Sequence, residues 1–202
     1  MKMDEYNRVK DMTYLEYCDY LQNKYGIGRD DYFSPKWNKK RKVSRTKEGL
    51  FAHHKMEDHM ILLSTPAIAK TAPYEWQKKE NIVYCDYLEH LLLHVLIRKY
   101  PAEDALVESV GIGGILAFLV PELNDIYSGW IPKQAWQRTC RDAVIDDEDV
   151  YLAILRQFIV GELTRGSDFD IERDLFSSRN EQYGTWDRKR NEKLFDRISM
   201  IL

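Results

Sequence analysis

Cysteine, net charge and long apolar runs are all scarce in this sequence. The three cysteines, Cys18, Cys85 and Cys140, are odd in number, and no two have CxxC spacing. This argues against a disulfide framework and is typical of reduced thiols in a cytoplasmic protein. The longest apolar run, 112–120, is interrupted by glycines and is too short to span a bilayer. The first residues lack the apolar segment of a signal peptide. We therefore expect a cytoplasmic protein that has no membrane partner.

Net charge gives no reason to expect a polyanionic partner, but the distribution of charge does. The chain of 202 residues has 30 Lys and Arg against 33 Asp and Glu. Residues 36–47 nevertheless contain seven basic residues and no acid, whereas residues 142–174 are rich in acids. Basic side chains that neutralise phosphates supply most non-specific affinity for nucleic acids. We expect phosphate contacts from Lys36, Lys39, Lys40, Arg41, Lys42, Arg45 and Lys47. Trp37 is available to stack on a base.

The hydrophobic pattern predicts a mainly helical chain with one small β element. Apolar residues at helical spacing indicate helices over 13–25, 86–99, 101–119, 133–143, 148–164 and 186–200, and a short helix near 67–70. Thr13 with Glu16 forms a capping-box pattern, and Asp86 suits an N-cap. Pro101 is expected in the first turn of its helix, and Pro121 is expected to end it. Short strands are expected at 49–53 and 81–84.

The five histidines all lie between His53 and His94. His90 and His94 are four residues apart, so on a helix they share one face, with Cβ atoms about 5–6 Å apart. Two imidazoles so placed can bind one divalent ion. The adjacent His53 and His54 point to opposite faces of a strand, so both reach one site only if the strand ends or bends there. In such a site one imidazole binds metal and the other is free to act as a general base.

The spacing of these histidines and one asparagine resembles a known nuclease motif. His53, His54, Asn81, His90 and His94 form the pattern HH-x26-N-x8-H-x3-H. This pattern is similar to the HNH motif, also called the ββα-metal or His-Me finger. The segment ENIVYCDYLEHLLLH resembles the second half of the motif in the nuclease colicins, where an Asn-Ile pair opens the second strand. The resemblance covers residues 49–97 and implies an α+β fold, mainly α with a small ββα-metal finger.

Carried onto this sequence, the resemblance implies a metal-dependent endonuclease that hydrolyses phosphodiester bonds in DNA. His54 would be the general base that deprotonates the attacking water. Asn81 would brace the loop between the strands and hold His54 through backbone hydrogen bonds. His53, His90 and His94 would bind one divalent ion, Mg²⁺, Mn²⁺, Ni²⁺ or Zn²⁺, which would stabilise the phosphate and the leaving oxygen.

Two features depart from the colicin pattern. The insert of 26 residues between His54 and Asn81 is longer than in the compact colicin finger. Phe51 also stands where the colicins have an acid, two positions before the histidine pair. With the finger in place, we expect an N-terminal helical segment (1–35), a basic lead-in with the finger (36–100) and a C-terminal helical region (101–202) in one compact unit.

Two other functions fit the same residues. A zinc ion could stabilise a nucleic-acid- or protein-binding module that has no turnover, although structural zinc sites usually use cysteine. The same finger could also cleave RNA, because the mechanism does not need a 2′-hydroxyl group.

Four other features have ordinary structural interpretations. We interpret Glu89 as a solvated helix residue, His59 as a surface histidine and Cys85 as a small apolar residue. The GIGG sequence at 111–114 lacks the Lys-Ser/Thr of a phosphate-binding loop, so helix packing or a kink explains it.

Overall fold

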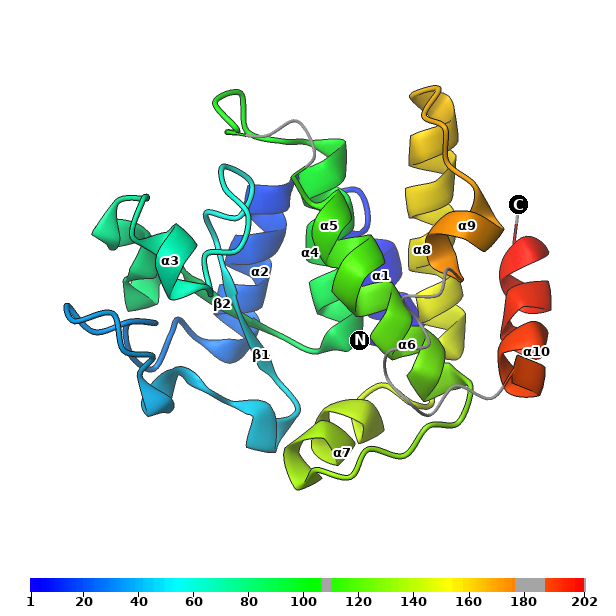
Figure 1. Cartoon of the computed structure of the whole chain (residues 1–202), viewed down its shortest axis with the longest axis horizontal. Helices are drawn as coiled ribbons and strands as arrows, with labels where there is room; N and C mark the ends of the chain where they lie inside the picture. The colour runs from blue at the N-terminus through cyan, green and yellow to red at the C-terminus, as the bar shows by residue number, and fades with distance from the viewer. Residues whose placement is uncertain (107–109, 177–187, 202) are drawn as a thin grey trace.

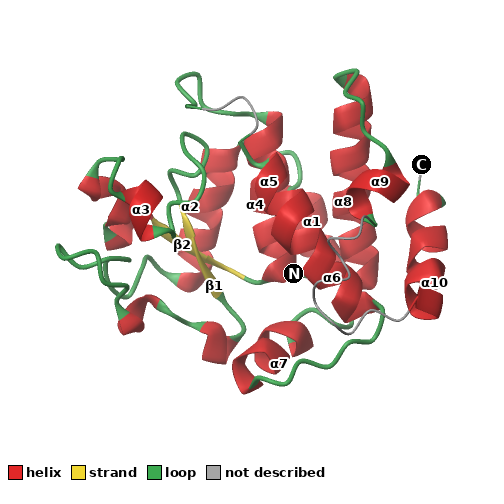
Figure 2. Ribbon diagram, viewed as in Figure 1, coloured by secondary structure: helices red, strands yellow, loops and turns green. Residues whose placement is uncertain are grey.

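The structure, a computed structural model, describes residues 1–106, 110–176 and 188–201, with only the backbone described at 188–191. These residues form helices around one two-stranded sheet (Figures 1 and 2). The longer helices are α1 (Met3–Val9), α2 (Tyr14–Tyr25), α4 (Tyr87–Lys99), α6 (Val120–Tyr127), α7 (Ala135–Asp142), α8 (Glu148–Thr164) and α10 (Arg188–Ser199). The short helices are α3 (Pro66–Ala69), α5 (Ile112–Gly114) and α9 (Ile171–Leu175). The strands are β1 (Phe51–His54) and β2 (Ile82–Cys85). The expected α+β class, mainly α, is therefore confirmed.

The sheet and the helix that follows it have the sequence order β1, β2, α4. The two strands are antiparallel, and His53 and His54 pair with Val83 and Ile82. Asp86 directly follows β2 and caps α4: its side chain accepts a hydrogen bond from the Glu89 backbone, while the Glu89 side chain accepts one from the Asp86 backbone. This capping box starts α4 at once and so brings its first turns back beside β1.

Helix α4 lies in the middle of the molecule. Its apolar residues from Leu91 to Leu93 are fully buried. Helix α2 packs against β2 and α4 on one side, and α8 packs against α4 on the other, as Figure 1 shows. The capping box of α2, expected from Thr13 and Glu16, is present. A helix enclosed in this way holds its side chains in fixed positions, which a metal site requires.

The helix predicted over 101–119 is wrong at both ends. Residues 101–106 are not helical, residues 107–109 lie outside the described part, and the first helix described after them is α5. A π-helical turn, Ile115–Leu119, then continues directly into α6. Pro121 lies in the first turn of α6 rather than ending the helix, because the π-helical turn directly before it already interrupts the regular α-helical hydrogen-bond ladder.

Three smaller differences concern short elements. The strands lie one or two residues later than expected, because the chain turns at Gly49 and because Asn81 closes a 3₁₀ turn. Helix α9 was not expected; its apolar residues are too few to give a periodic pattern. Residues 186 and 187 of the expected last helix lie outside the described part.

Within the described residues, no helix combines the length and apolar character that a bilayer crossing needs.

Candidate metal centre

Three of the four expected site histidines converge in one group. One ring nitrogen from each of His53, His90 and His94 lies within 4.8 Å of the other two. The closest pair is His53 Nδ1 and His90 Nε2, at 3.2 Å. Two nitrogens bound to one zinc ion at 2.0–2.1 Å would lie about 3.0–3.4 Å apart, so this pair already has the spacing of shared ligands. The group could therefore hold a metal ion.

Tyr14 selects the ring nitrogen that His53 offers to the group. The Tyr14 hydroxyl lies 2.9 Å from His53 Nε2 and donates to the backbone carbonyl of His54 at 3.3 Å. The hydroxyl has one proton, so when it donates to this carbonyl it accepts from the N–H of His53 at Nε2. The lone pair of His53 is then at Nδ1, the atom that faces His90. Burial holds the pKa of Tyr14 well above its usual value, so the hydroxyl keeps its proton.

Burial keeps the three imidazoles neutral. It places the pKa of His53 well below its usual value, and neighbouring histidine charges lower it further. The pKa of His90 is likewise well below its usual value, first through burial and then through His94. The pKa of His94 is lowered by burial, although Glu57 opposes the shift. Neutral imidazoles have a free lone pair at neutral pH, which is the form that binds metal.

Two glycines of the GIGG sequence allow α5 to pack onto His94. A Cβ atom at Gly114 would lie 2.3 Å from His94 Cε1, and one at Gly111 would lie 2.7 Å from the His94 backbone oxygen. Neither position has room for a side chain. The packing explanation of this sequence is therefore confirmed, and the two glycines prove to be neighbours of the histidine group.

His54 lies at the end of the same strand and is held by a glutamine. It is fully buried, and its Nε2 lies 3.0 Å from Oε1 of Gln77. Gln77 Nε2 in turn donates to the Leu63 carbonyl at 3.5 Å, which fixes the amide with Oε1 toward the histidine. His54 therefore donates through Nε2–H, and its lone pair is at Nδ1. That atom is buried and has no hydrogen-bond partner among the described residues.

Asn81 connects the two ends of the long insert. Its backbone carbonyl accepts a hydrogen bond from the Lys55 N–H at 2.8 Å, directly after the histidine pair. Its side-chain amide donates to the Glu75 carbonyl, also at 2.8 Å. Asn81 thus links the end of β1 to the loop before β2, while its role in holding His54 stays a prediction.

Glu57 approaches three of the four histidines. Its Oε2 atom lies 3.6 Å from both His53 Nδ1 and His94 Nε2, and its Oε1 atom lies 3.7 Å from His54 Nδ1. A tight turn after β1, closed by a 3.1 Å hydrogen bond from the Glu57 N–H to the His54 carbonyl, produces this approach. An acid therefore does lie beside the histidine pair, although it comes after the pair in the chain and not two positions before it, where Phe51 stands.

The basic run forms an irregular loop in which some cations already have acidic partners. Lys40 pairs with Asp30 at 2.7 Å, and Arg45 pairs with Glu48 at 2.7 Å. The exposed members of the run are Lys36, Lys39, Arg41, Lys42 and Lys47. Trp37 is only partly exposed, and its ring lies 5.9 Å from Phe33. Phosphate contact stays a prediction for the run, with the exposed members best placed to make it.

The remaining candidates lie outside the histidine group. Glu89 is fully buried and accepts from Lys24 at 2.7 Å, so the interpretation as a solvated residue is wrong. It is buried because the capping box turns its side chain toward α2. His59 pairs with Asp104 at 2.7 Å. Cys85 is buried, as expected of a small apolar residue.

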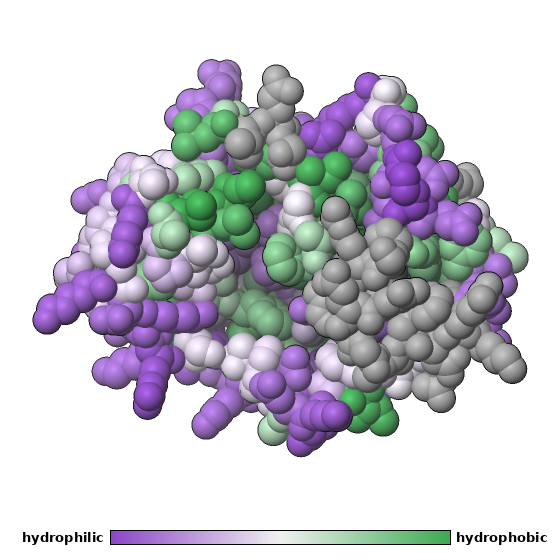
Figure 3. Space-filling view, viewed as in Figure 1, coloured by the Kyte–Doolittle hydropathy of each residue, from purple (hydrophilic) through white to green (hydrophobic). Residues whose placement is uncertain are grey.

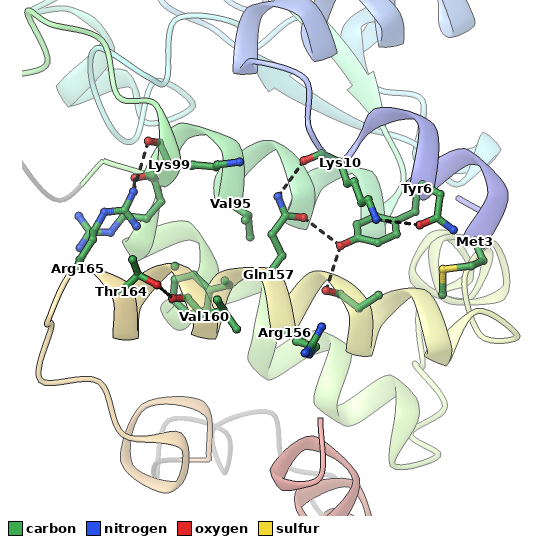
Figure 4. Close-up of a pocket in the computed structure, with 15 residues that line it drawn as sticks. Met3, Tyr6, Lys10, Val95, Lys99, Arg156, Gln157, Val160, Thr164 and Arg165 are labelled. Atoms are coloured by element: carbon green, nitrogen blue, oxygen red, sulfur yellow. Dashed lines mark hydrogen bonds between the residues drawn. The ribbon is translucent and has the colours of Figure 1, made fainter. Parts of the chain in front are cut away.

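A separate pocket of about 650 Å³ lies between α1, α4 and α8, away from the histidines (Figure 4). Its rim is basic, with Lys10, Lys99 and Arg156 among its residues. The polar groups at its centre are paired with one another: Gln157 donates to the Lys10 carbonyl at 2.9 Å and accepts from Tyr6 at 3.0 Å. We assign no ligand to this pocket.

Three residues of the centre were not expected from the sequence. Glu57 follows the histidine pair at a turn spacing, which is the one signal that could have revealed it. Tyr14 belongs to the apolar face of α2, where it reads as a core residue. Gln77 lies in the insert that has no periodic pattern.

Figure 3 shows the surface hollowed between the part that carries α3 and the part that carries α5 and α6, with hydrophilic residues inside the hollow.

No family model, curated protein or solved structure matches the chain.

Proposed function

We propose that this protein is a metal-dependent endonuclease that hydrolyses phosphodiester bonds in DNA. One observation carries the proposal: a three-histidine group stands beside a fourth histidine with a free lone pair, at the end of one strand. Imidazole ligands suit zinc, nickel and related ions. A bound divalent ion supplies a Lewis acid that stabilises negative charge on the phosphate and the leaving oxygen.

His54 is the general base of this proposal. The hydrogen bond from Nε2 to Gln77 leaves Nδ1 to accept the proton of the attacking water. The same bond becomes charge-assisted once the ring is protonated, so Gln77 favours the imidazolium form as it develops. Asn81 fixes the end of β1 through the Lys55 N–H and thereby keeps the ring in place.

The exposed lysines and arginines of the 36–47 loop are proposed to hold the nucleic acid. Charges on flexible side chains neutralise backbone phosphates without reading sequence. Removing them should weaken binding uniformly and lower its dependence on salt.

A nicking assay tests this function. Purified protein is incubated with supercoiled plasmid and Mg²⁺, Mn²⁺, Ni²⁺ or Zn²⁺ in turn. We expect cleavage with at least one metal, loss of cleavage in His54→Ala and in His94→Ala, and retention in His59→Ala, the matched histidine outside the group. Equal inertness of the wild type and His54→Ala with every metal would reject a catalytic role. Matched DNA and RNA strands in the same assay separate a deoxyribonuclease from a ribonuclease.

Burial of the histidines favours a second function, a metal-stabilised binding module without turnover. His53 is 1% exposed and His94 is 7% exposed, as expected of a closed structural site. In this case His94→Ala should unfold the metal-bound protein, and His54→Ala should change nothing beyond local packing. A dependence of cleavage on His54 excludes this function.

A further inference from the structure

Glu57 has a negative charge that lacks a positive partner. Its side chain is 15% exposed. Among the residues that the structure describes, no lysine or arginine lies within ion-pair distance of it; the adjacent Lys55 pairs with Asp19 instead. A mostly buried carboxylate is unfavourable unless a cation compensates it.

The positions of the donor atoms show where such a cation would lie. Glu57 Oε2 lies 3.6 Å from His53 Nδ1 and 3.6 Å from His94 Nε2, and the same His53 nitrogen lies 3.2 Å from His90. Nitrogen and oxygen ligands of one ion, at 2.0–2.2 Å from it, would lie about 3.0–3.5 Å apart. A shift of a few tenths of an ångström would therefore bring the carboxylate into the ligand set.

We propose that Glu57 is the fourth protein ligand of the metal centre, through Oε2, and that the centre selects a transition-metal ion over Mg²⁺. This inference rests on the metal site of the proposed function. Three imidazoles and one carboxylate match the preferences of Zn²⁺, Mn²⁺, Ni²⁺ and Co²⁺, whereas Mg²⁺ requires oxygen ligands. These ions can take a fifth ligand, so four protein ligands still leave a position for the phosphate. The carboxylate halves the charge of the buried ion, which three neutral rings cannot do.

The second carboxylate oxygen connects the ligand set to the base. Glu57 Oε1 lies 3.7 Å from His54 Nδ1, the atom assigned the free lone pair. A water molecule that both groups contact would be held between the metal centre and His54. A role in holding this water would explain why an acid follows the histidine pair in this chain.

Metal titration of the purified full chain tests the assignment. Zn²⁺, Mn²⁺ and Mg²⁺ are each titrated in competition with a chelating dye, and stoichiometry is read by native mass spectrometry. We expect one Zn²⁺ or Mn²⁺ per chain and weaker binding of Mg²⁺. Glu57→Gln should weaken Zn²⁺ binding by about tenfold or more, equivalent to about 1.4 kcal/mol. Asp58→Asn, which removes the neighbouring acid of the same turn, should leave affinity unchanged.

Thermal melting separates this effect from misfolding. Metal-free Glu57→Gln should be at least as stable as the metal-free wild type, because the uncompensated charge is gone, and it should gain less stability on adding Zn²⁺. If Glu57→Gln fails to fold, Glu57→Asp retains the charge with a shorter side chain and should bind Zn²⁺ more weakly than the wild type.

The outcomes distinguish the two proposals. If His94→Ala loses Zn²⁺ but Glu57→Gln and Glu57→Asp bind it as the wild type does, Glu57 is not a ligand and the three-histidine site stands. Equal affinity of the wild type for Mg²⁺ and Zn²⁺ overturns the stated selectivity. If the wild type binds no metal stoichiometrically, the metal site of the proposed function fails together with this inference.

Discussion

Replacing Gly114 by alanine should displace a metal ligand without removing it. The added Cβ would lie 2.3 Å from His94 Cε1, 2.4 Å from Nδ1 and 2.8 Å from Nε2. Ordinary contacts between such atoms are about 3.5–4.0 Å, so the ring or α5 must move by more than 1 Å. Overpacking of a core typically costs about 1–3 kcal/mol, and the higher helix propensity of alanine offsets up to about 1 kcal/mol of that. We therefore expect a net loss of about 0–3 kcal/mol in unfolding free energy.

The effect on metal binding should be separable from the effect on folding. A ligand moved by about 1 Å no longer has bonding geometry, so Zn²⁺ affinity should fall by more than about tenfold. Gly113→Ala is the matched control, because a Cβ at Gly113 meets nothing within 4 Å. Urea unfolding of the metal-free proteins measures stability, and competition with a chelating dye measures Zn²⁺ affinity.

A double substitution makes this reasoning refutable. In Gly114→Ala combined with His94→Ala, the overlap disappears, so the double variant should be more stable than the sum of the single effects predicts. Unchanged Zn²⁺ affinity in Gly114→Ala, together with additive stabilities, would show that His94 and α5 are not packed as described.

Three further predictions follow from single contacts. Tyr14→Phe removes the acceptor that fixes the tautomer of His53; we expect metal affinity to fall by about tenfold, as read by dye competition, and normal affinity would refute this. Gln77→Leu removes the acceptor of the base histidine; DNA cleavage should fall by about 10–100-fold while Zn²⁺ affinity stays unchanged, and a matching loss of both would indicate a structural effect instead. Burial, with Glu122 second, raises the pKa of Asp125 to about 7 from its usual 3.8, and both of its carboxylate oxygens lack a partner among the described residues. Between pH 4 and 7 the folded state therefore binds a proton that the unfolded state has lost, and the unfolding free energy falls as pH rises, by at most about 4 kcal/mol. Asp125→Asn should flatten this fall in urea unfolding measured across that range; the exposed Asp11→Asn should not, and equal slopes in the two variants would contradict the assignment.

Local signals in the sequence were sufficient for much of the secondary structure. The helix expected at 148–164 has those same bounds, and the capping box at Thr13 and the N-cap at Asp86 were expected from the sequence. These features depend on hydrogen bonds and apolar spacing within a few residues. The stretch at 101–119 was misread because Gly111 and the following π-helical turn are determined by packing against α4, which no local pattern records.

The sequence by itself indicated a candidate metal site within residues 53–94, because spacing on a helix places two imidazoles on one face. Only the tertiary structure decided which atoms face the site. Tyr14 and Gln77 assign the tautomers of the two adjacent histidines, and Glu57 reaches them through a turn. Hydrogen bonds between segments distant in the chain decide which ring nitrogen holds the proton, so that choice has no signature in the sequence.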